Sequence, residues 1–365
     1  LARRWVCAGA SYNAGSPGAP PGPYHGPSMD PANPHPFVLR PILKAKVWGG
    51  QRLSAYGKAL NPAERVGESW EVADLASTDP GGGGGDEARS VIATGPLTGR
   101  TLHDAMDAWG CGLLGPAGTG GAGGGGGFPL LVKYLDAREH LSVQVHPSPA
   151  YAAANPGAHL KTESWYVVEA EPGAELFVGL LAGVTRGDLA AAIRAGRVPE
   201  VMRRRPAVRG ECHTLPSGTV HALGAGVLVA EVQTPSDTTF RLYDWTNEYD
   251  RPERALHAEQ ALACALFEDP PAPVAAAGER SVVATTGFYT MEVVRASCKS
   301  LPVGGDGPVV VMVVRSMGAA VASASNAWPE VTLSAGQTCV VPAACASDAV
   351  LRCGPETEIV LARVG

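Results

Sequence analysis

PSGTVHALGAGVLVAEV, residues 216–232, is the stretch that decides the fold. A Pro-x-Gly-x-x-His segment, Pro216 to His221, predicts a tight turn, because proline and glycine favour turn conformations. The apolar residues that follow are typical of a buried β-strand. Two further segments, LSVQVHP at 141–147 and ESWYVVEA at 163–170, have the same character. The chain is therefore expected to build its core from short strands.

Strand-like runs continue along the rest of the sequence, and helical patterns are few. The other predicted strands lie at 37–50, 67–75, 128–137, 174–180, 212–215, 238–245, 287–296, 308–316, 330–343 and 358–364. Helices are predicted at 98–114, at 188–195 continuing over 198–204, and at 251–267. Many short strands with few helices indicate a mainly β protein of stacked antiparallel barrels or jelly rolls.

Composition divides the chain into three predicted parts. Residues 1–36 are rich in Gly, Ala, Pro and Ser, a composition that cannot build a core. This leader is either disordered, with the true start at Met29, or the remnant of a transit peptide. The Pro/Ala-rich residues 269–278 are a plausible linker, which predicts one domain at 37–268 and a second at 279–365. Two glycine tracts, 81–85 and 118–127, are expected to be flexible surface loops.

The bulk properties exclude several functions. The chain has 365 residues and a formal net charge of −6, and its Lys and Arg are scattered, which argues against nucleic acid as the main partner. No stretch is long and apolar enough for a membrane span. The eight cysteines form no Cys-x-x-Cys pair, so we expect buried free thiols in a reducing compartment. The cytoplasm is the predicted location, with an organelle interior as the alternative. The oligomeric state cannot be predicted.

Four side chains form a candidate metal site. Gln144 and His146 are two residues apart in a predicted strand, so their side chains share a face. Glu163 opens a run that should be buried, and a buried carboxylate needs a partner such as a metal. His221 ends the turn before a core strand. Two imidazoles, a carboxylate and an amide oxygen suit zinc or a similar divalent ion.

The order of motifs resembles that of a known family. Pro-x-Gly-x-x-His before an apolar strand resembles the second metal motif of the cupin barrels. Seven motifs in sequence resemble type I phosphomannose isomerases, in particular the short bacterial-type branch: VWGG (47–50), GESWEVA (67–73), LVKYLDA (131–137), QVHP (144–147), KTESWY (161–166), VHAL (220–223) and DTTFRLYDW (237–245). The resemblance covers the chain from about Phe37 to its end and implies two cupin-type jelly-roll barrels with a small helical insertion.

The resemblance also implies an activity and its residues. It implies a zinc-dependent isomerase that interconverts mannose 6-phosphate and fructose 6-phosphate through an enediol, with one zinc per chain held by Gln144, His146, Glu163 and His221. The family's essential arginine matches Arg241. No histidine follows His257, so the second barrel is expected to lack a metal.

Basic residues near the metal motifs are candidates for binding the sugar phosphate. Lys161 projects to the same face as Glu163 if the strand begins there, Lys133 is the second candidate, and Glu68 is a further one. The proton-transferring base stays open between a zinc-bound water, Lys161 and Glu68. Two other functions remain as alternatives: an iron or manganese cupin oxidoreductase, and a non-catalytic sugar-binding cupin.

Overall fold

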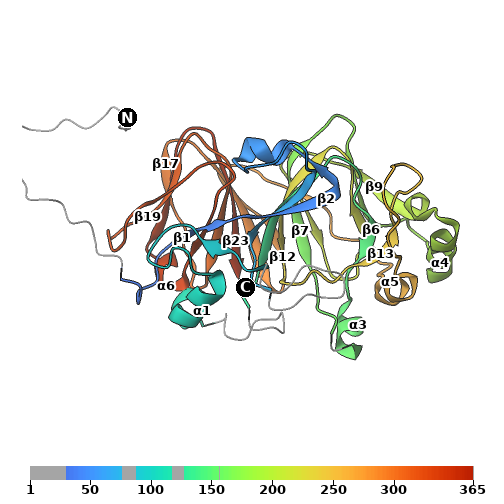
Figure 1. The fold of residues 1–365 in the computed structure, drawn as a ribbon, viewed down its shortest axis with the longest axis horizontal. Helices are drawn as coiled ribbons and strands as arrows, with labels where there is room; N and C mark the ends of the chain where they lie inside the picture. The colour runs from blue at the N-terminus through green and yellow to red at the C-terminus, as the bar shows by residue number, and fades with distance from the viewer. Residues whose placement is uncertain (1–29, 76–87, 117–126, 156, 365) are drawn as a thin grey trace, which may run out of the picture.

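The computed structural model describes residues 30–75, 88–116, 127–155 and 157–364. The chain is mainly β, and the strands within these described residues form four sheets. They are arranged as two pairs along the length of the molecule (Figure 1). The predicted class, a mainly β protein with cupin-type jelly-roll barrels, is confirmed.

The first pair of sheets carries the metal motifs. Its seven-stranded sheet has the order β14 (Val274–Ala275), β10 (Glu211–Leu215), β7 (Glu163–Ala170), β12 (Val227–Gln233), β5 (Leu131–Ala137), β2 (Ile42–Gly50) and β3 (Val66–Val72). Its five-stranded sheet has the order β13 (Phe240–Tyr243), β6 (Val143–Val145), β11 (His221–Leu223), β8 (Glu175–Leu180) and β9 (Met202–Pro206). Side chains of both sheets, including Trp165, Leu176 and Leu223, share one buried cluster. These two sheets therefore form one barrel, because every second side chain of their strands points to this shared cluster.

The second pair of sheets is built mostly from the C-terminal third of the chain. Its seven-stranded sheet has the order β15 (Arg280–Thr285), β16 (Tyr289–Ala296), β23 (Thr357–Val364), β18 (Val309–Arg315), β21 (Thr338–Val341), β1 (Phe37–Arg40) and β4 (Val91–Ile92). Its four-stranded sheet has the order β17 (Lys299–Pro302), β22 (Ala349–Cys353), β19 (Ala319–Ser323) and β20 (Val331–Leu333). Because β1 pairs with β21, residues 37–40 lie in the sheet of the C-terminal unit. The predicted division into 37–268 and 279–365 stays a prediction.

The two seven-stranded sheets share a large apolar core. Buried residues of β5, β7 and β12 pack with residues of β16, β18 and β23 in a single cluster. Tyr289 of β16 reaches across it: its hydroxyl donates to the carbonyl oxygen of Val232 at 2.9 Å and lies 3.0 Å from Oγ of Ser164. The second unit thus contacts the strand that begins with Glu163.

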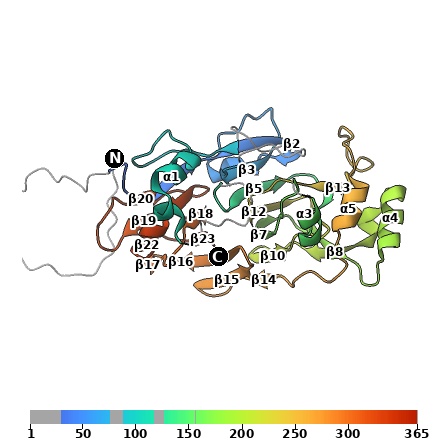
Figure 2. The same ribbon diagram turned by 90° about the horizontal axis from the view of Figure 1, so that it is seen from below.

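Helices cover the outside of the sheets. They are α1 (Leu102–Trp109), α2 (Cys111–Leu114), α3 (Pro149–Ala154), α4 (Arg186–Ala195), α5 (Ala258–Cys264) and α6 (Ala343–Ala346), with short 3₁₀ turns at Arg52–Tyr56 and Val198–Val201. Figures 1 and 2 show α4 and α5 at the end of the molecule farthest from β17 and β19. Both helices pack on the five-stranded sheet through one apolar cluster.

The helix predictions need three corrections. The single helix predicted over 98–114 is two helices. The first begins after its N-cap Thr101, and Gly110, with φ of 47°, separates it from the second. The helix predicted over 198–204 is wrong beyond residue 201, where β9 pairs with β8. The helix predicted over 251–267 is limited to α5, since residues 251–257 adopt no regular secondary structure.

Other sequence expectations have mixed outcomes. The seven described cysteines are all free, as predicted, but Cys111 and Cys298 are exposed rather than buried. The tracts at 81–85 and 118–126 and residues 1–29 of the leader lie outside the described residues. Within the part of the chain that is described, no helix has the length and apolar character needed to cross a membrane.

A buried ion pair joins the two seven-stranded sheets, and its loss is expected to destabilise the fold. Nζ of Lys58 lies 2.6 Å from Oε1 of Glu71 in β3 and donates to the carbonyl oxygen of Gly336 at 2.7 Å. Oε2 of Glu71 accepts from Thr338 of β21. Lys58→Met leaves a buried carboxylate without its cation, so the free energy of unfolding should fall by about 3–5 kcal/mol. Urea unfolding measures this difference.

The matched control for that change removes both charges. The double variant Lys58→Met, Glu71→Gln should regain most of the lost stability, because no uncompensated charge remains buried. A Lys58→Met protein as stable as the unmodified chain would contradict the proposed contribution of this pair.

Candidate metal centre and active-site cavity

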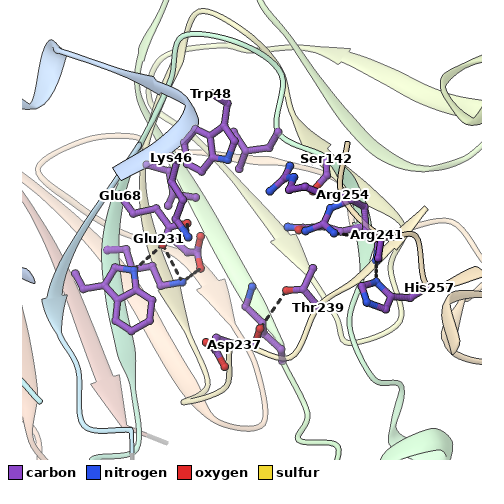
Figure 3. A pocket seen from close by; sticks show the side chains of 17 residues that line it. Lys46, Trp48, Glu68, Ser142, Glu231, Asp237, Thr239, Arg241, Arg254 and His257 are labelled. Carbon is purple, nitrogen blue, oxygen red and sulfur yellow. Dashed lines mark hydrogen bonds and ion pairs between the residues drawn. The ribbon is translucent and has the colours of Figure 1, made fainter. Parts of the chain in front are cut away.

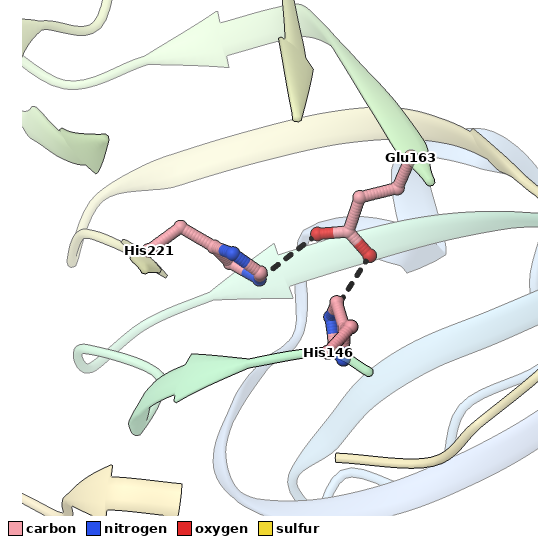
Figure 4. A group of neighbouring side chains, drawn as sticks. All are labelled: His146, Glu163 and His221. Atoms are coloured by element: carbon pink, nitrogen blue, oxygen red, sulfur yellow. Dashed lines mark ion pairs between the residues drawn. The ribbon is translucent and has the colours of Figure 1, made fainter. Parts of the chain in front are cut away.

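Three buried side chains converge inside the first barrel: His146, Glu163 and His221 (Figure 4). One ligand atom from each lies within 4.8 Å of the others. Nε2 of His221 is 3.0 Å from Oε1 of Glu163, and Nε2 of His146 is 3.4 Å from Oε2. The strands explain this convergence, since Glu163 opens β7, His221 opens β11 and His146 directly follows β6. The three groups therefore meet from separate strands, as the sequence predicts.

Gln144 completes the predicted set of four. It lies opposite His221 in the register of β6 and β11, and its Nε2 is 3.3 Å from Nε2 of His221. Rotating the amide by half a turn exchanges its nitrogen and oxygen. Gln144 is thus placed to present an amide oxygen to the same point as the three other groups.

Backbone carbonyls fix the tautomers of both histidines. Nδ1 of His146 lies 2.9 Å from the carbonyl oxygen of Thr238, and Nδ1 of His221 lies 2.8 Å from that of Thr219. A carbonyl oxygen only accepts, so both Nδ1 atoms carry a proton, and each ring in its neutral form presents the lone pair of Nε2. Such contacts to the outer nitrogen are typical of metal-binding histidines.

The electrostatics of the cluster call for a cation. With a neutral His221 ring, its Nε2 lone pair would face a carboxylate oxygen of Glu163 at 3.0 Å, a repulsive contact that a bound cation between the two atoms would remove. Burial and the nearby Lys161 lower the pKa of His146 to about 3, so this ring stays neutral. Burial alone would raise the pKa of Glu163, but Lys161 and the two histidines hold it well below its usual range. A neutral imidazole and an ionised carboxylate are the forms that bind metals. The donor set therefore fits a divalent ion.

Lys161 lies between this cluster and the adjacent cavity. Its Nζ is 2.9 Å from Oε2 of Glu163 and 3.0 Å from Nε2 of His146. The sequence predicts that Lys161 shares a face with Glu163 only if the strand begins at Lys161. The strand β7 begins at Glu163 instead, yet the long side chain of Lys161 still reaches the Glu163 carboxylate. Burial alone would lower the pKa of Lys161, but Glu163 and Glu231 raise it above its ordinary value, so the amine is an ammonium.

A cavity of about 330 Å³ opens beside the cluster (Figure 3). Its polar lining includes Lys46, Glu68, Lys133, Ser142, Gln144, Lys161, Glu231, Asp237, Thr239, Arg241, Arg254 and His257. Trp48 and Trp70 supply aromatic surface. A cavity of this size with many hydrogen-bonding groups suits a small, highly polar ligand.

Lysines and glutamates alternate along one wall of the cavity. Nζ of Lys46 is 3.1 Å from Oε1 of Glu68, and Nζ of Lys133 lies 3.9 Å from Glu68 and 3.8 Å from Glu231. Burial alone would raise the pKa of Glu68, but Lys46 and Lys133 lower it to about 2. Burial raises the pKa of Glu231, and Lys133 only partly offsets this. The pKa values of Glu68 and Glu231 are therefore shifted in opposite directions.

Arg241 lies on β13, directly opposite Gln144 of β6. Its side chain is 17% exposed and lines the cavity, and its Nη1 donates to the carbonyl oxygen of Ala255 at 2.9 Å. Nε is 4.0 Å from Oδ1 of Asp244, so the ion pair between these two side chains is a loose one. Burial and the nearby Arg254 lower the pKa of Arg241.

The structure brings together every residue that the sequence singles out. Gln144, His146, Glu163 and His221 meet at one point, and the cavity beside them is lined by Lys161, Lys133, Glu68 and Arg241. Their roles stay predictions. Sequence reasoning missed other polar lining residues, among them Glu231, Arg254 and His257. Glu231 had a detectable signal, because it is a lone acid inside the apolar run VLVAEV.

Comparison with known proteins gives relatives of one kind, although no family model matches the chain. A mannose-6-phosphate isomerase from Streptococcus mutans is 36% identical over 263 residues, which cover 70% of this chain and 77% of that protein. The crystal structure of the mannose 6-phosphate isomerase from Bacillus subtilis superposes with a TM-score of 0.71 at 27% identity, covering 90% of this chain and 99% of that one.

A further solved structure shares the fold. It is a mannose 6-phosphate isomerase bound with zinc and yttrium, with a TM-score of 0.65 and 17% identity over 90% of this chain and 99% of that one. At such low identity the likeness concerns the fold alone. The Streptococcus mutans relative, however, is 36% identical over more than two thirds of both chains, which establishes the family. The chain belongs to the mannose-6-phosphate isomerase family.

Proposed function

We propose that the chain is a zinc-dependent aldose–ketose isomerase that interconverts mannose 6-phosphate and fructose 6-phosphate through an enediol. The observation that carries this proposal is the buried meeting of two imidazole Nε2 atoms and a carboxylate beside a polar cavity. Family membership supports the isomerase activity. It also argues against the iron or manganese oxidoreductase and the non-catalytic sugar-binding protein.

One zinc ion per chain would be held by Gln144, His146, Glu163 and His221. Zinc accepts nitrogen and oxygen ligands of this kind, and a family member of the same fold is bound with zinc. When bound, the ion supplies positive charge that orients and polarises sugar oxygens. The backbone carbonyl oxygens of Thr238 and Thr219 hold a proton on each Nδ1, so that Nε2 is the ring atom that would bind the ion.

The remaining side chains serve proton transfer and charge stabilisation. In an aldose-to-ketose step, a base takes the proton from C2 while the oxygen on C1 gains one, giving the enediol. C1 then gains a proton and the oxygen on C2 loses one. Arg241 is always cationic and adjoins Gln144, so it can stabilise charge that develops on these oxygens.

The base is best sought among the groups of the cavity wall. Glu68, with its pKa of about 2, is a weak base at neutral pH, and Lys161 is an ammonium that can donate but not accept. Glu231 has a raised pKa and therefore binds a proton more readily. We assign Glu231 the base, Lys161 the acid, and Glu68 and Lys133 contacts to the substrate.

Metal removal tests the proposal directly. Dialysis against a chelator should abolish the interconversion, measured in a coupled assay with mannose 6-phosphate, and added zinc should restore it. Metal content determined on the same samples should approach one equivalent per chain. Full activity in the metal-free protein would contradict the proposal, and bound iron with oxygen consumption would favour the oxidoreductase instead.

A further inference from the structure

We infer that Arg254 and His257, on the irregular segment 251–257, form the subsite for the substrate's phosphate. The inference rests on the proposed function and adds to it the residues that recognise the phosphate. Both side chains line the cavity. Figure 3 shows them grouped with Arg241 on one side, whereas Lys46, Glu68 and Glu231 lie on the other.

The backbone sets these residues at a suitable separation from the metal cluster. His221 is paired with Gln144, and Gln144 with Arg241, across three neighbouring strands. The N–H of His257 then donates to the carbonyl oxygen of Arg241 at 2.8 Å, which places His257 one further step away. With strands about 4.8 Å apart, His257 lies roughly 10 Å from Gln144. An open six-carbon chain with a phosphate on C6 can extend across this interval when its C1 end is at the metal.

The charges at the two sides of the cavity are balanced differently. On the lysine side each ammonium already has a carboxylate partner: Lys46 has Glu68, Lys133 has Glu68 and Glu231, and Lys161 has Glu163. A dianion placed there would meet the repulsion of three carboxylates. The lysine side therefore suits sugar hydroxyls better than phosphate.

The arginine side carries an excess of positive charge. Asp244 is the carboxylate shared by three guanidinium groups, with Arg254 at 2.7 Å, Arg251 at 3.9 Å and Arg241 at 4.0 Å. Arg251 has a second partner in Glu139 at 3.0 Å, which leaves Arg241 and Arg254 with Asp244 between them. A phosphate bound here would complete the charge balance of this cluster.

Both proposed residues have their donors oriented by neighbouring groups. Asp244 accepts from Nε and Nη2 of Arg254, which fixes the guanidinium plane and leaves the Nη1 donors for an anion. Nδ1 of His257 accepts from the backbone N–H of Arg241 at 3.2 Å, so the ring proton resides on Nε2. Between these two residues in the sequence, the carbonyl oxygen of Ala255 accepts a hydrogen bond from Nη1 of Arg241. The segment is thereby fastened to β13 with an arginine and an imidazole N–H facing the cavity.

Two variants of the metal-loaded full chain test the assignment, Arg254→Met and His257→Gln. Each should lower kcat/KM for mannose 6-phosphate, by about 100-fold for Arg254→Met and about 10-fold for His257→Gln, and should lower kcat/KM for unphosphorylated mannose much less. Calorimetric titration with inorganic phosphate should show a matching loss of affinity. Glu253→Gln, a change in the same segment outside the cavity lining, should alter none of these values.

The outcomes separate this inference from the proposed function. If the unmodified chain isomerises mannose 6-phosphate and Arg254→Met does so with unchanged kcat/KM, the subsite assignment is wrong and the isomerase stands. A loss of phosphate affinity in Lys133→Met but not in Arg254→Met would also overturn it. If the unmodified chain isomerises nothing, the proposed function fails, whereas phosphate affinity that depends on Arg254 would still support an anion subsite. Arg254→Lys, which keeps a charge beside Asp244, replaces the methionine variant should that one unfold.

Discussion

His221→Ala should lose its bound metal and at least about a thousandfold in kcat. His221 is 1% exposed, its Nε2 points at Glu163, and its Nδ1 is fixed by the carbonyl oxygen of Thr219, so its loss removes one of the three converging ligand atoms. Metal ions lower barriers of this kind by several kcal/mol, and each 1.4 kcal/mol corresponds to a factor of ten. Metal analysis of the purified variant and the coupled isomerase assay measure the two losses.

A second buried histidine of the same barrel provides the matched control. His213 of β10 is also 1% exposed, but it lies opposite Trp165 and outside the metal cluster. His213→Asn therefore disturbs a comparable buried position and should retain one equivalent of metal. If His221→Ala also binds a full equivalent with unchanged affinity, the cluster is not the metal centre.

Arg241→Ala should keep its metal and lose about a hundredfold in kcat, the usual cost of removing an oriented donor to a developing oxyanion. Arg241 is not one of the side chains of the metal cluster, but it lines the cavity beside Gln144. The loss should persist at saturating substrate, because stabilisation of the transition state rather than substrate binding is removed. Steady-state kinetics distinguish a loss of transition-state stabilisation from a loss of substrate binding, and metal analysis of the same sample shows whether the metal is retained.

Two further variants qualify that result. Arg241→Lys should recover only part of the lost rate, since a lysine lacks the planar fork of donors. Arg204→Ala removes an arginine that packs over Phe177 of the same barrel, away from the cavity lining, and should leave kcat unchanged. An Arg241→Ala protein with normal kcat would show that the assigned role is wrong.

The parts of the fold that the sequence predicts are those that depend on local pattern. Alternating and continuous apolar runs located the strands, and the turn before His221 located the start of β11. Same-face spacing placed Gln144 and His146 on one side of a strand, and both do face the cluster. Residue type and position in predicted strands and turns group Gln144, His146, Glu163 and His221, and the family resemblance adds Arg241; their roles stay predictions.

The parts that the sequence does not predict depend on tertiary contacts. Residues 202–204 have helical spacing but form part of β9, because pairing with β8 satisfies their backbone groups. Segment 251–257 is held by β13 and by Asp244 rather than by its own helical hydrogen bonds. Arg254 and His257 therefore enter the cavity in a way that no periodicity of the sequence indicates.

Tyr289 links the C-terminal unit to the first barrel, so the two units are not expected to separate without loss. Its hydroxyl, which comes from the C-terminal unit, is anchored on Ser164 and Val232, and Ser164 is the immediate neighbour of Glu163. A truncation or chimera that discards the last hundred or so residues would remove these hydrogen bonds from the strand that begins at Glu163. The C-terminal unit thus supports the strand that begins at Glu163, and we expect the first barrel to depend on it.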